Sequence, residues 1–175
     1  PIERPGSLLR QLREEKKFQY DYISKGFRLI IFGLFIKMVV ADNVGYYVDL
    51  IYDDPNKYNS WDIILGMFLY SFQIYGDFFG YSTIALGSAK LIGFDITDNF
   101  NTPYLAKNIA EFWHRWHISL STWFRDYVYF PLGGSRVKFG RWAYNIMVVF
   151  LLSGIWHGAA WNFIFWGIAH GLLHI

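Results

Sequence analysis

Cysteine is absent from this 175-residue chain. Its absence excludes disulfide bonds, thiolate zinc sites and a cysteine nucleophile among these residues. Charge is scarce as well, because charged residues make up 17% of the sequence and the formal net charge is +2. Soluble domains carry about 25% charged residues. A charge balance this small argues against nucleic acid as the main partner, and we expect none.

Motifs of nucleotide-binding and hydrolytic enzymes are also missing. The chain contains no Gly-x-Ser-x-Gly elbow, no P-loop and no Rossmann glycine pattern, so soluble hydrolases and nucleotide enzymes lack support. No signal-peptide pattern follows Pro1, and the chain ends within an apolar stretch. We therefore expect residues 1–175 to be the central part of a single transmembrane domain that belongs to a longer protein.

Apolar and aromatic side chains are abundant: hydrophobic residues make up 54% of the sequence and aromatic residues 22%. Tyrosine and tryptophan favour membrane interfaces, where an apolar ring and a polar tip both find a suitable medium. From Trp142 to Ile175 the chain contains no Asp, Glu, Lys or Arg. A run of that length can cross a hydrocarbon core of roughly 30 Å. This composition predicts an all-α integral membrane protein, a multi-helix transmembrane bundle with interfacial or re-entrant helices.

The candidate membrane segments are three apolar stretches, at 27–50, 61–93 and 142–175. Lys37 and Asp42 lie inside the first stretch, which argues for a protein-lined position or a broken helix, since charges that face lipid are costly. The second stretch would be about 50 Å long as one helix, too long for a bilayer without strong tilt. We therefore expect two helical pieces that meet at 76–80, with Asp77 in a polar pocket.

Two further segments are amphipathic. Residues 8–17 mix leucines with basic and acidic side chains, which suits a short helix in the membrane interface and equally a solvated helix face. Residues 105–130 form a second amphipathic helical region, which ends at Pro131 and the glycine turn after it.

Basic residues gather at 10–28 and 115–141, whereas the loop at 53–59 is acidic apart from one lysine. The positive-inside rule then places both basic clusters in the cytoplasm and the acidic loop outside, with two crossings between the clusters.

His157 is the first functional candidate, because an ionisable residue in an uncharged apolar segment usually faces a cavity, a partner or a substrate path. A neutral imidazole there is suited to general base catalysis, since its unperturbed pKa is near 6.5. A histidine hydrogen-bonded between packed helices is the structural alternative. Two GxxxG patterns, Gly154–Gly158 and Gly167–Gly171, allow close helix contact, and for the second we expect packing alone.

His117 is the second candidate. On a single helix over 111–127 it falls at the border between an apolar stripe and a polar face, where a side chain is both partly desolvated and reachable. An amphipathic helix in the interface, with His117 filling a surface slot, explains the pattern at least as well. Glu111, His114 and His117 are capable of binding metal, but a di-iron site needs a second such motif and none is visible. We expect no metal.

Two other functions stay open on the residues alone. A proton-coupled transporter or channel subunit would use Asp77, His157 and His170 as a relay, although such proteins carry inverted repeats longer than any echo in this chain. A membrane haem or scaffold protein would use its histidines as ligands and would show a visible absorbance band.

Four stretches together resemble the membrane-bound O-acyltransferase (MBOAT) family, and most of all its bacterial polysaccharide O-acetyltransferases of the alginate type. The stretches are Gln73–Ser82, Glu111–Tyr127, Pro131–Arg136 and Ser153–Gly158. The long central stretch, in register with the Trp-His-Gly sequence at 156–158, is highly specific.

This resemblance implies an acyltransferase in which His157 is the catalytic base for an acceptor hydroxyl, while His117 orients the acceptor or stabilises charge. It implies no bound cofactor and a cytoplasmic thioester donor, either acyl-CoA (acetyl-CoA foremost) or an acyl carrier protein. The side chains that we expect to contact substrate are Asp77, Ser121, Arg125, Asp126, Trp156 and Asn162.

The resemblance also implies a place in the cell. Such a protein would be multi-pass in the bacterial inner (plasma) membrane and in contact with its lipid. It would work with periplasmic or extracellular acetyl-transfer partner proteins toward an exported polysaccharide acceptor.

Overall fold

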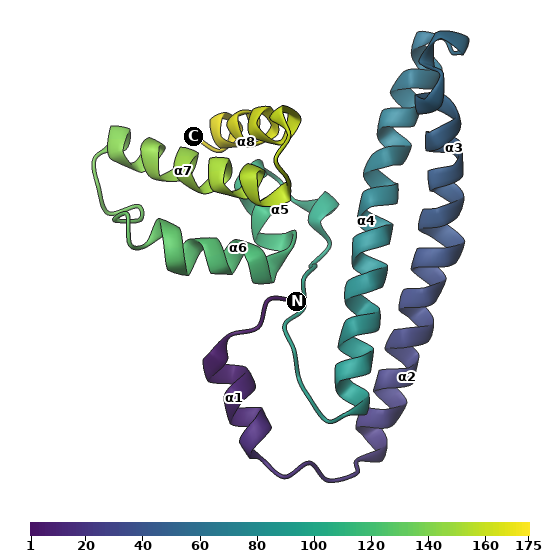
Figure 1. Ribbon diagram of the computed structural model, residues 1–175, viewed down its shortest axis with the longest axis vertical. Helices are drawn as coiled ribbons and strands as arrows, with labels where there is room; N and C mark the ends of the chain where they lie inside the picture. Colours follow the sequence, from purple (N-terminus) through teal and green to yellow (C-terminus); the bar gives the residue numbers. More distant parts are fainter. The chain divides into compact units, whose positions relative to one another are not determined.

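The computed structural model describes all residues, 1–175, and shows an all-helical chain, which confirms the predicted all-α class (Figure 1). Its contacts divide it into two compact units, residues 3–99 and 100–175, with Pro1 grouped with the first and Ile2 with the second. The elements of the first unit are α1 (Pro5–Arg13), α2 (Tyr20–Leu34), η1 (Phe35–Ala41), α3 (Asp42–Asp53), η2 (Pro55–Lys57) and α4 (Ser60–Leu91). Those of the second are η3 (Pro103–Leu105), α5 (Ile109–Arg115), α6 (Ile118–Phe124), η4 (Arg125–Tyr129), α7 (Phe139–His157) and α8 (Trp161–His174).

The first unit is built on a long helical hairpin. Its first arm runs without interruption through α2, the π-helical turn η1 and α3, beside the second arm, α4 (Figure 1). The two arms are joined by the short 3₁₀ turn η2. Asn59 caps α4: its side chain accepts hydrogen bonds from the N–H groups of Trp61 (2.8 Å) and Asp62 (3.2 Å). The side chain of Asp62 accepts in return from the Asn59 N–H, which completes a capping box.

Helix α4 is continuous from Ser60 to Leu91, so the predicted break at 76–80 is wrong. The glycines in that stretch serve close packing between the arms. A Cβ on Gly80 would lie 2.8 Å from the Gly33 carbonyl oxygen, and a Cβ on Gly76 would lie 3.1 Å from the Ala41 Cβ. At such contacts the absence of a side chain lets two helix backbones approach closely, and no break in the helix is needed.

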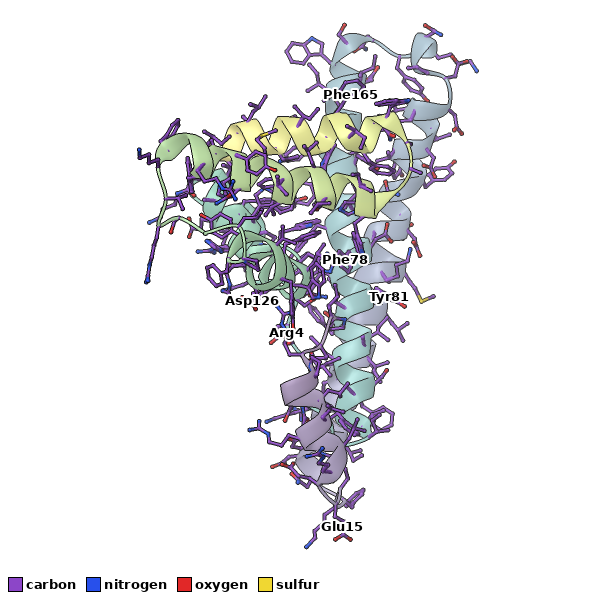
Figure 2. All side chains as sticks on the ribbon, turned by 60° about the vertical axis from the view of Figure 1, so that its left-hand side comes forward. Arg4, Glu15, Phe78, Tyr81, Asp126 and Phe165 are labelled. Carbon is purple, nitrogen blue, oxygen red and sulfur yellow. The ribbon has the colours of Figure 1, made fainter.

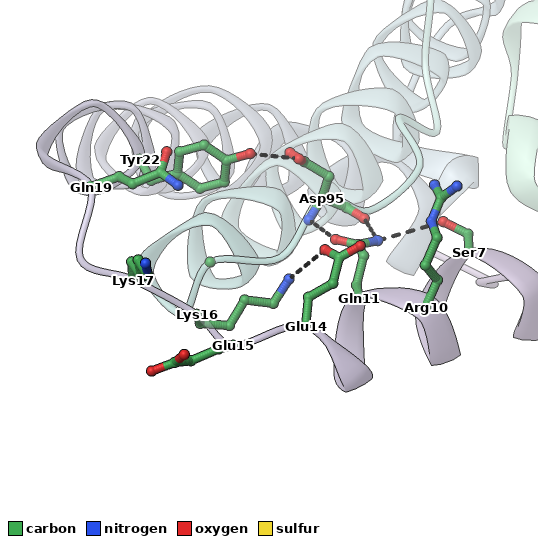
Figure 3. A pocket seen from close by; sticks show the side chains of 11 residues that line it. Ser7, Arg10, Gln11, Glu14, Glu15, Lys16, Lys17, Gln19, Tyr22 and Asp95 are labelled. Carbon is green, nitrogen blue, oxygen red and sulfur yellow. Dashed lines mark hydrogen bonds and ion pairs between the residues drawn. The ribbon is translucent and has the colours of Figure 1, made fainter.

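Helix α1 is held against the segment that follows α4 (Figure 3). The Gln11 side chain donates to the Asp95 carbonyl at 2.8 Å and accepts from the Asp95 N–H at 2.7 Å. The Tyr22 hydroxyl donates to the Asp95 carboxylate at 2.7 Å, beside a polar cavity of about 520 Å³. The helix ends at Arg13, so the last residues of the predicted helix 8–17 are extended chain. Its place in the membrane interface stays a prediction.

In the second unit the predicted helix over 105–130 is interrupted. Trp116 is extended and forms an isolated antiparallel bridge with Phe100, so that α5 ends at Arg115. A new helix, α6, starts after His117 and continues into the π-helical turn η4. The single helix on which the sequence placed His117 is therefore wrong, because a tertiary contact at Trp116 overrides the local helical pattern.

The charge-free stretch 142–175 contains two helices. Helix α7 ends at His157, and α8 begins at Trp161 and runs back along it in the opposite direction. A Cβ on Gly154 would collide with the Phe163 carbonyl oxygen, and one on Gly171 would lie 2.7 Å from the Met147 sulfur. The packing role expected for the second GxxxG pattern is confirmed, and Gly154 of the first pattern packs in the same way.

Helices α4 and α7 are each long and apolar enough to cross a membrane, judged by length and composition. Large apolar side chains are exposed on the surfaces of both units, for example Tyr81 of α4 and Phe165 of α8 (Figure 2). The wider arrangement of a multi-helix bundle stays a prediction.

Candidate active site

His117 occupies a backbone position that few side chains adopt. It is the N-cap of α6 with φ 44° and ψ 54°, in the left-handed region. The extended residue before it is fixed by the bridge to Phe100, and the helix after it is fixed by the buried side chains of Leu120 and Phe124. A non-glycine residue held in this conformation costs free energy, and such residues cluster at active sites.

The His117 side chain is buried, with 9% of the residue exposed. The pKa of its imidazole is lowered from 6.5 to about 4, first because burial strips the charged form of its hydration and also because positive charge lies nearby. His117 is therefore neutral at physiological pH. A neutral imidazole offers one donor and one acceptor nitrogen, which suits it to orienting a hydroxyl group or a carbonyl.

His157 is the last residue of α7 and is exposed in this chain. Gly158 turns the backbone immediately after it, with φ 153°, and a Cβ at that position would lie 2.8 Å from the Phe163 ring. The His157 ring lies against three aromatic rings, with centroid distances of 5.2 Å to Trp166, 6.0 Å to Phe163 and 5.0 Å to Trp156. The turn at Gly158 and these rings set the direction of the imidazole.

The fold brings two of the second unit's histidines, His117 and His157, close together. The Trp156 ring contacts both, with centroids 6.0 Å from His117 and 5.0 Å from His157. The imidazoles are close enough that a charge on His157 would lower the pKa of His117. One histidine is thus buried and neutral, and the other is accessible. This pair can take up a proton at His157 while His117 holds the group from which the proton comes.

Further aromatic rings pack against Trp166, one of the three rings around His157. The Trp166 ring is 4.7 Å from the His170 ring and 5.6 Å from Trp113, measured between centroids. His170 Nδ1 and Trp113 Nε1 are both buried and have no hydrogen-bond partner. The sequence singled out His157 but missed Trp166 and Phe163 as its neighbours. The only sequence signal for these neighbours was the glycine at 158, which allows the turn that brings α8 back against α7.

The residues expected to contact substrate are found in different environments. Trp156 is 54% exposed and touches both histidines, and Asn162 is exposed in the first turn of α8. The Ser121 hydroxyl donates to the Trp116 carbonyl at 3.2 Å, which closes the first turn of α6. Arg125 and Asp126 form an ion pair with each other at 2.9 Å.

Asp77, the remaining expected substrate contact, belongs to the first unit. It forms an ion pair with Lys37 at 2.6 Å.

The Glu111 carboxylate is bound to neighbouring residues of its own segment. Its carboxylate accepts from the Lys107 N–H at 2.7 Å and pairs with Arg115 at 2.6 Å, and these two contacts lower its pKa. The helix break at Trp116 also turns His117 away from the register that the predicted metal-capable triplet would need. No group of three or more His, Asp or Glu side chains is arranged to hold a metal ion.

Known proteins share much of this sequence. The sequence profile of MBOAT, the membrane-bound O-acyltransferase family, matches residues 7–175. The chain is 40% identical over 174 residues to a peptidoglycan O-acetyltransferase of Helicobacter pylori, covering 98% of this chain and 33% of that protein. It is 43% identical over 153 residues to a probable alginate O-acetylase of Azotobacter vinelandii, covering 86% of this chain and 30% of that protein.

A third relative belongs to another branch. The chain is 36% identical over 167 residues to a teichoic acid D-alanyltransferase of Bacillus subtilis, covering 87% of this chain and 40% of that protein. The chain thus spans roughly a third of the length of the relatives it matches. From the extent of these matches, the chain belongs to the membrane-bound O-acyltransferase family.

Proposed function

We propose that the protein transfers an acetyl group from a cytoplasmic thioester, acetyl-CoA or an acyl carrier protein, toward the hydroxyl groups of an exported polysaccharide. The observation that carries the proposal is the convergence of His117 and His157 on Trp156. The family membership supports the reaction class, and relatives named for peptidoglycan and alginate O-acetylation support a polysaccharide acceptor. Acyl transfer from a thioester requires no resident cofactor.

In this proposal His157 is the general base. A ring nitrogen of His157 takes the proton of the acceptor hydroxyl as the hydroxyl oxygen attacks the thioester carbonyl carbon. The new C–O bond forms, the C–S bond breaks, and the proton held on His157 passes to the departing thiolate. Positioned proton transfer contributes a factor of about 10²–10⁴, so positioning and electrostatics must supply the rest of the acceleration.

His117 is assigned the orienting role. Burial keeps it neutral, with a pKa of about 4, so it is a weak base but a good hydrogen-bonding partner. A neutral donor that points at the acceptor or at the developing oxyanion stabilises the transition state without gaining or losing a proton.

The other assignments are part of the same proposal. Trp156 forms a wall of the reaction site between the histidines. The further proposed substrate contacts are Asp77, Ser121, Arg125, Asp126 and Asn162. We also propose a multi-pass protein of the bacterial inner membrane that passes acetyl groups to partner proteins in the periplasm or outside the cell. Two helices able to span a membrane support that location.

The test uses the full-length protein in its own host, with ester-linked acetate on the exported polymer as the readout. We expect His157→Ala to lower the acetate content at least about 100-fold, the lower end of what a positioned base contributes. We expect His117→Ala to cause a smaller loss. His114→Ala is the matched control, because His114 is exposed on the neighbouring helix α5 and should leave acetate unchanged.

Membrane abundance must be matched among the four proteins. Unchanged acetate in His157→Ala at equal abundance would reject His157 as the base.

A further inference from the structure

An ion cluster lies on the hairpin of the first unit. Lys37, in the π-helical turn η1, pairs with Asp77 of α4 at 2.6 Å and also with Asp42, the first residue of α3. The wide turn frees backbone carbonyls, and Asn43 caps one of them by donating to the Val39 carbonyl at 2.8 Å. Such π-helical turns are rare in proteins as a whole, and those that occur are often found at functional sites.

The cluster lies about halfway along both arms of the hairpin. At 1.5 Å per residue, Lys37 is about 25 Å from Tyr20 and about 24 Å from Asp53, the two ends of the first arm. Asp77 is about 26 Å from Ser60 and about 21 Å from Leu91, the two ends of α4. If α4 crosses the bilayer, as its length and composition allow, these charges lie near the membrane centre.

The cluster has more acceptors than donors. Two carboxylates share one ammonium group, which leaves one net negative charge. One helical turn before Asp77, the Gln73 side-chain oxygen is buried without a hydrogen-bond partner, where the amide packs against Gly45. A net charge at this depth is expensive, and charged residues in membrane segments are nearly always paired or face a cavity.

The excess charge faces outward. The Asp42 side chain is 50% exposed, and Met38 and Tyr46, one turn before and one turn after it, are 59% and 62% exposed. Lipid cannot neutralise a carboxylate, which favours a protein surface over this face. The chain spans roughly a third of the length of these relatives, so a protein of their size has most of its residues outside 1–175.

We infer that a membrane helix of the same polypeptide, from outside residues 1–175, packs on this face and presents a Lys or Arg that pairs with Asp42. One cation brings the cluster to two positive and two negative charges. It also places hydrogen-bond donors near the unpaired oxygen of Gln73. A bound proton, lipid alone or a second protein are the competing ways to cover Asp42, and each gives a different result below.

The first measurement is photo-crosslinking in native membranes of the full-length protein. A benzophenone amino acid replaces Met38 in one variant and Tyr46 in another, so the charged residues stay intact. We expect intramolecular crosslinks to one hydrophobic segment outside residues 1–175 that contains a Lys or Arg. Crosslinks to lipid only, to a second copy or to a different protein would overturn the inference.

The second measurement is thermal stability of the purified full-length protein. Asp42→Asn leaves the partner cation unpaired, and we expect its melting temperature to fall by on the order of 5 °C. Asp49→Asn is the matched control on the same helix, because Asp49 is exposed near the end of the arm. Neutralising the basic residue found by crosslinking should recover most of the loss in the Asp42→Asn protein.

An Asp42→Asn protein at least as stable as Asp49→Asn, or a loss that the second substitution does not recover, would overturn the pairing. Polysaccharide acetylation is not the readout in either experiment, so the result is independent of the proposed function.

Discussion

His117 has two unfavourable features, a left-handed backbone and a buried ionisable ring. Both are maintained by the surrounding structure, since the bridge at Trp116 fixes the backbone and the start of α6 fixes the next residues. Residues held in such conformations cluster at functional sites, which supports the orienting role proposed for His117. As a result, the His117 imidazole is neutral at physiological pH, and this can be tested by titration.

The first prediction concerns pH. The folded-state pKa of His117, about 4, lies below its ordinary value of 6.5, so the folded state binds the proton less well than the unfolded state. Its contribution to stability is therefore complete above about pH 6.5 and is lost as the pH falls toward 4. Between pH 7 and pH 5 the loss should reach roughly 1–2 kcal/mol in the free energy of unfolding. Unfolding of the purified full-length protein in detergent at both pH values measures it.

His117→Gln is the comparison, because glutamine keeps polar atoms in the site and does not titrate. The wild type should lose more stability than this variant between pH 7 and pH 5. Equal losses in the two proteins would show that His117 titrates normally in the folded state.

Gly158 sets the direction of His157. Its φ of 153° disfavours any side chain, and a Cβ would lie 2.8 Å from the Phe163 ring that packs against His157. We expect Gly158→Ala to displace the imidazole and to lower acyl transfer at least tenfold, since a strained backbone costs about 1–3 kcal/mol and 1.4 kcal/mol corresponds to a factor of ten. Gly140→Ala on the same helix meets nothing within 4 Å and should leave the transfer rate unchanged. Rates are compared at equal protein abundance, and equal rates for the two variants would contradict the assigned role.

Among the elements, the packing of α2 against α4 depends on the backbone contact at Gly33 and Gly80. A Cβ on Gly80 would lie 2.8 Å from the Gly33 carbonyl oxygen and 3.0 Å from the Lys37 nitrogen, both backbone atoms that cannot rotate away. We expect Gly80→Ala to destabilise the full-length protein by roughly 1–3 kcal/mol, the usual cost of overpacking. Thermal melting in detergent measures the effect. Gly6→Ala is the control, because a Cβ at Gly6 has open space, and this variant should melt like the wild type. Equal melting temperatures for the two variants would mean that the contact at Gly80 tolerates a methyl group.

The helices themselves were predictable to a limited degree. Apolar composition was enough for the all-α class and for the existence of α4 and α7. The continuity of the helices was not predictable, because Gly76 and Gly80 serve close packing whereas Gly158 makes a turn. The same residue type thus has opposite roles, and the difference depends on what lies across the interface.

The candidate site rested on the family resemblance, and only in part on physical pattern, and the roles of its residues stay predictions. His157 stood out as an ionisable residue in an apolar segment, whereas His117 had equal support as a surface histidine. The reason for its burial is the break at Trp116, which comes from a bridge to Phe100, sixteen residues earlier in the chain. Local periodicity contains no information on such a contact. The aromatic neighbours of His157 were missed for the same reason, since α8 reaches them only by folding back.

At the scale of the whole molecule, we expect the hairpin of the first unit to fix which ends share a side of the membrane. Its two arms are each about 50 Å long, more than the roughly 30 Å hydrocarbon core. If both arms cross the bilayer, the connecting loop and the opposite ends emerge into water on either side. Basic residues gather before and in the first turns of α2, and acidic residues surround the loop at η2. By the positive-inside rule we expect the loop to face outward and α1 to face the cytoplasm.

Single cysteines test this orientation, because the chain has none of its own. In full-length protein without other cysteines, Asn56→Cys in the loop should react with a small membrane-impermeant maleimide added to intact cells. Lys17→Cys, between α1 and α2, should react only after the membrane is permeabilised, because the reagent then reaches the cytoplasmic side. Labelling of both positions in intact cells would mean that the hairpin does not cross the membrane. Labelling of Lys17→Cys alone would reverse the topology and place the basic cluster on the side where the positive-inside rule disfavours it.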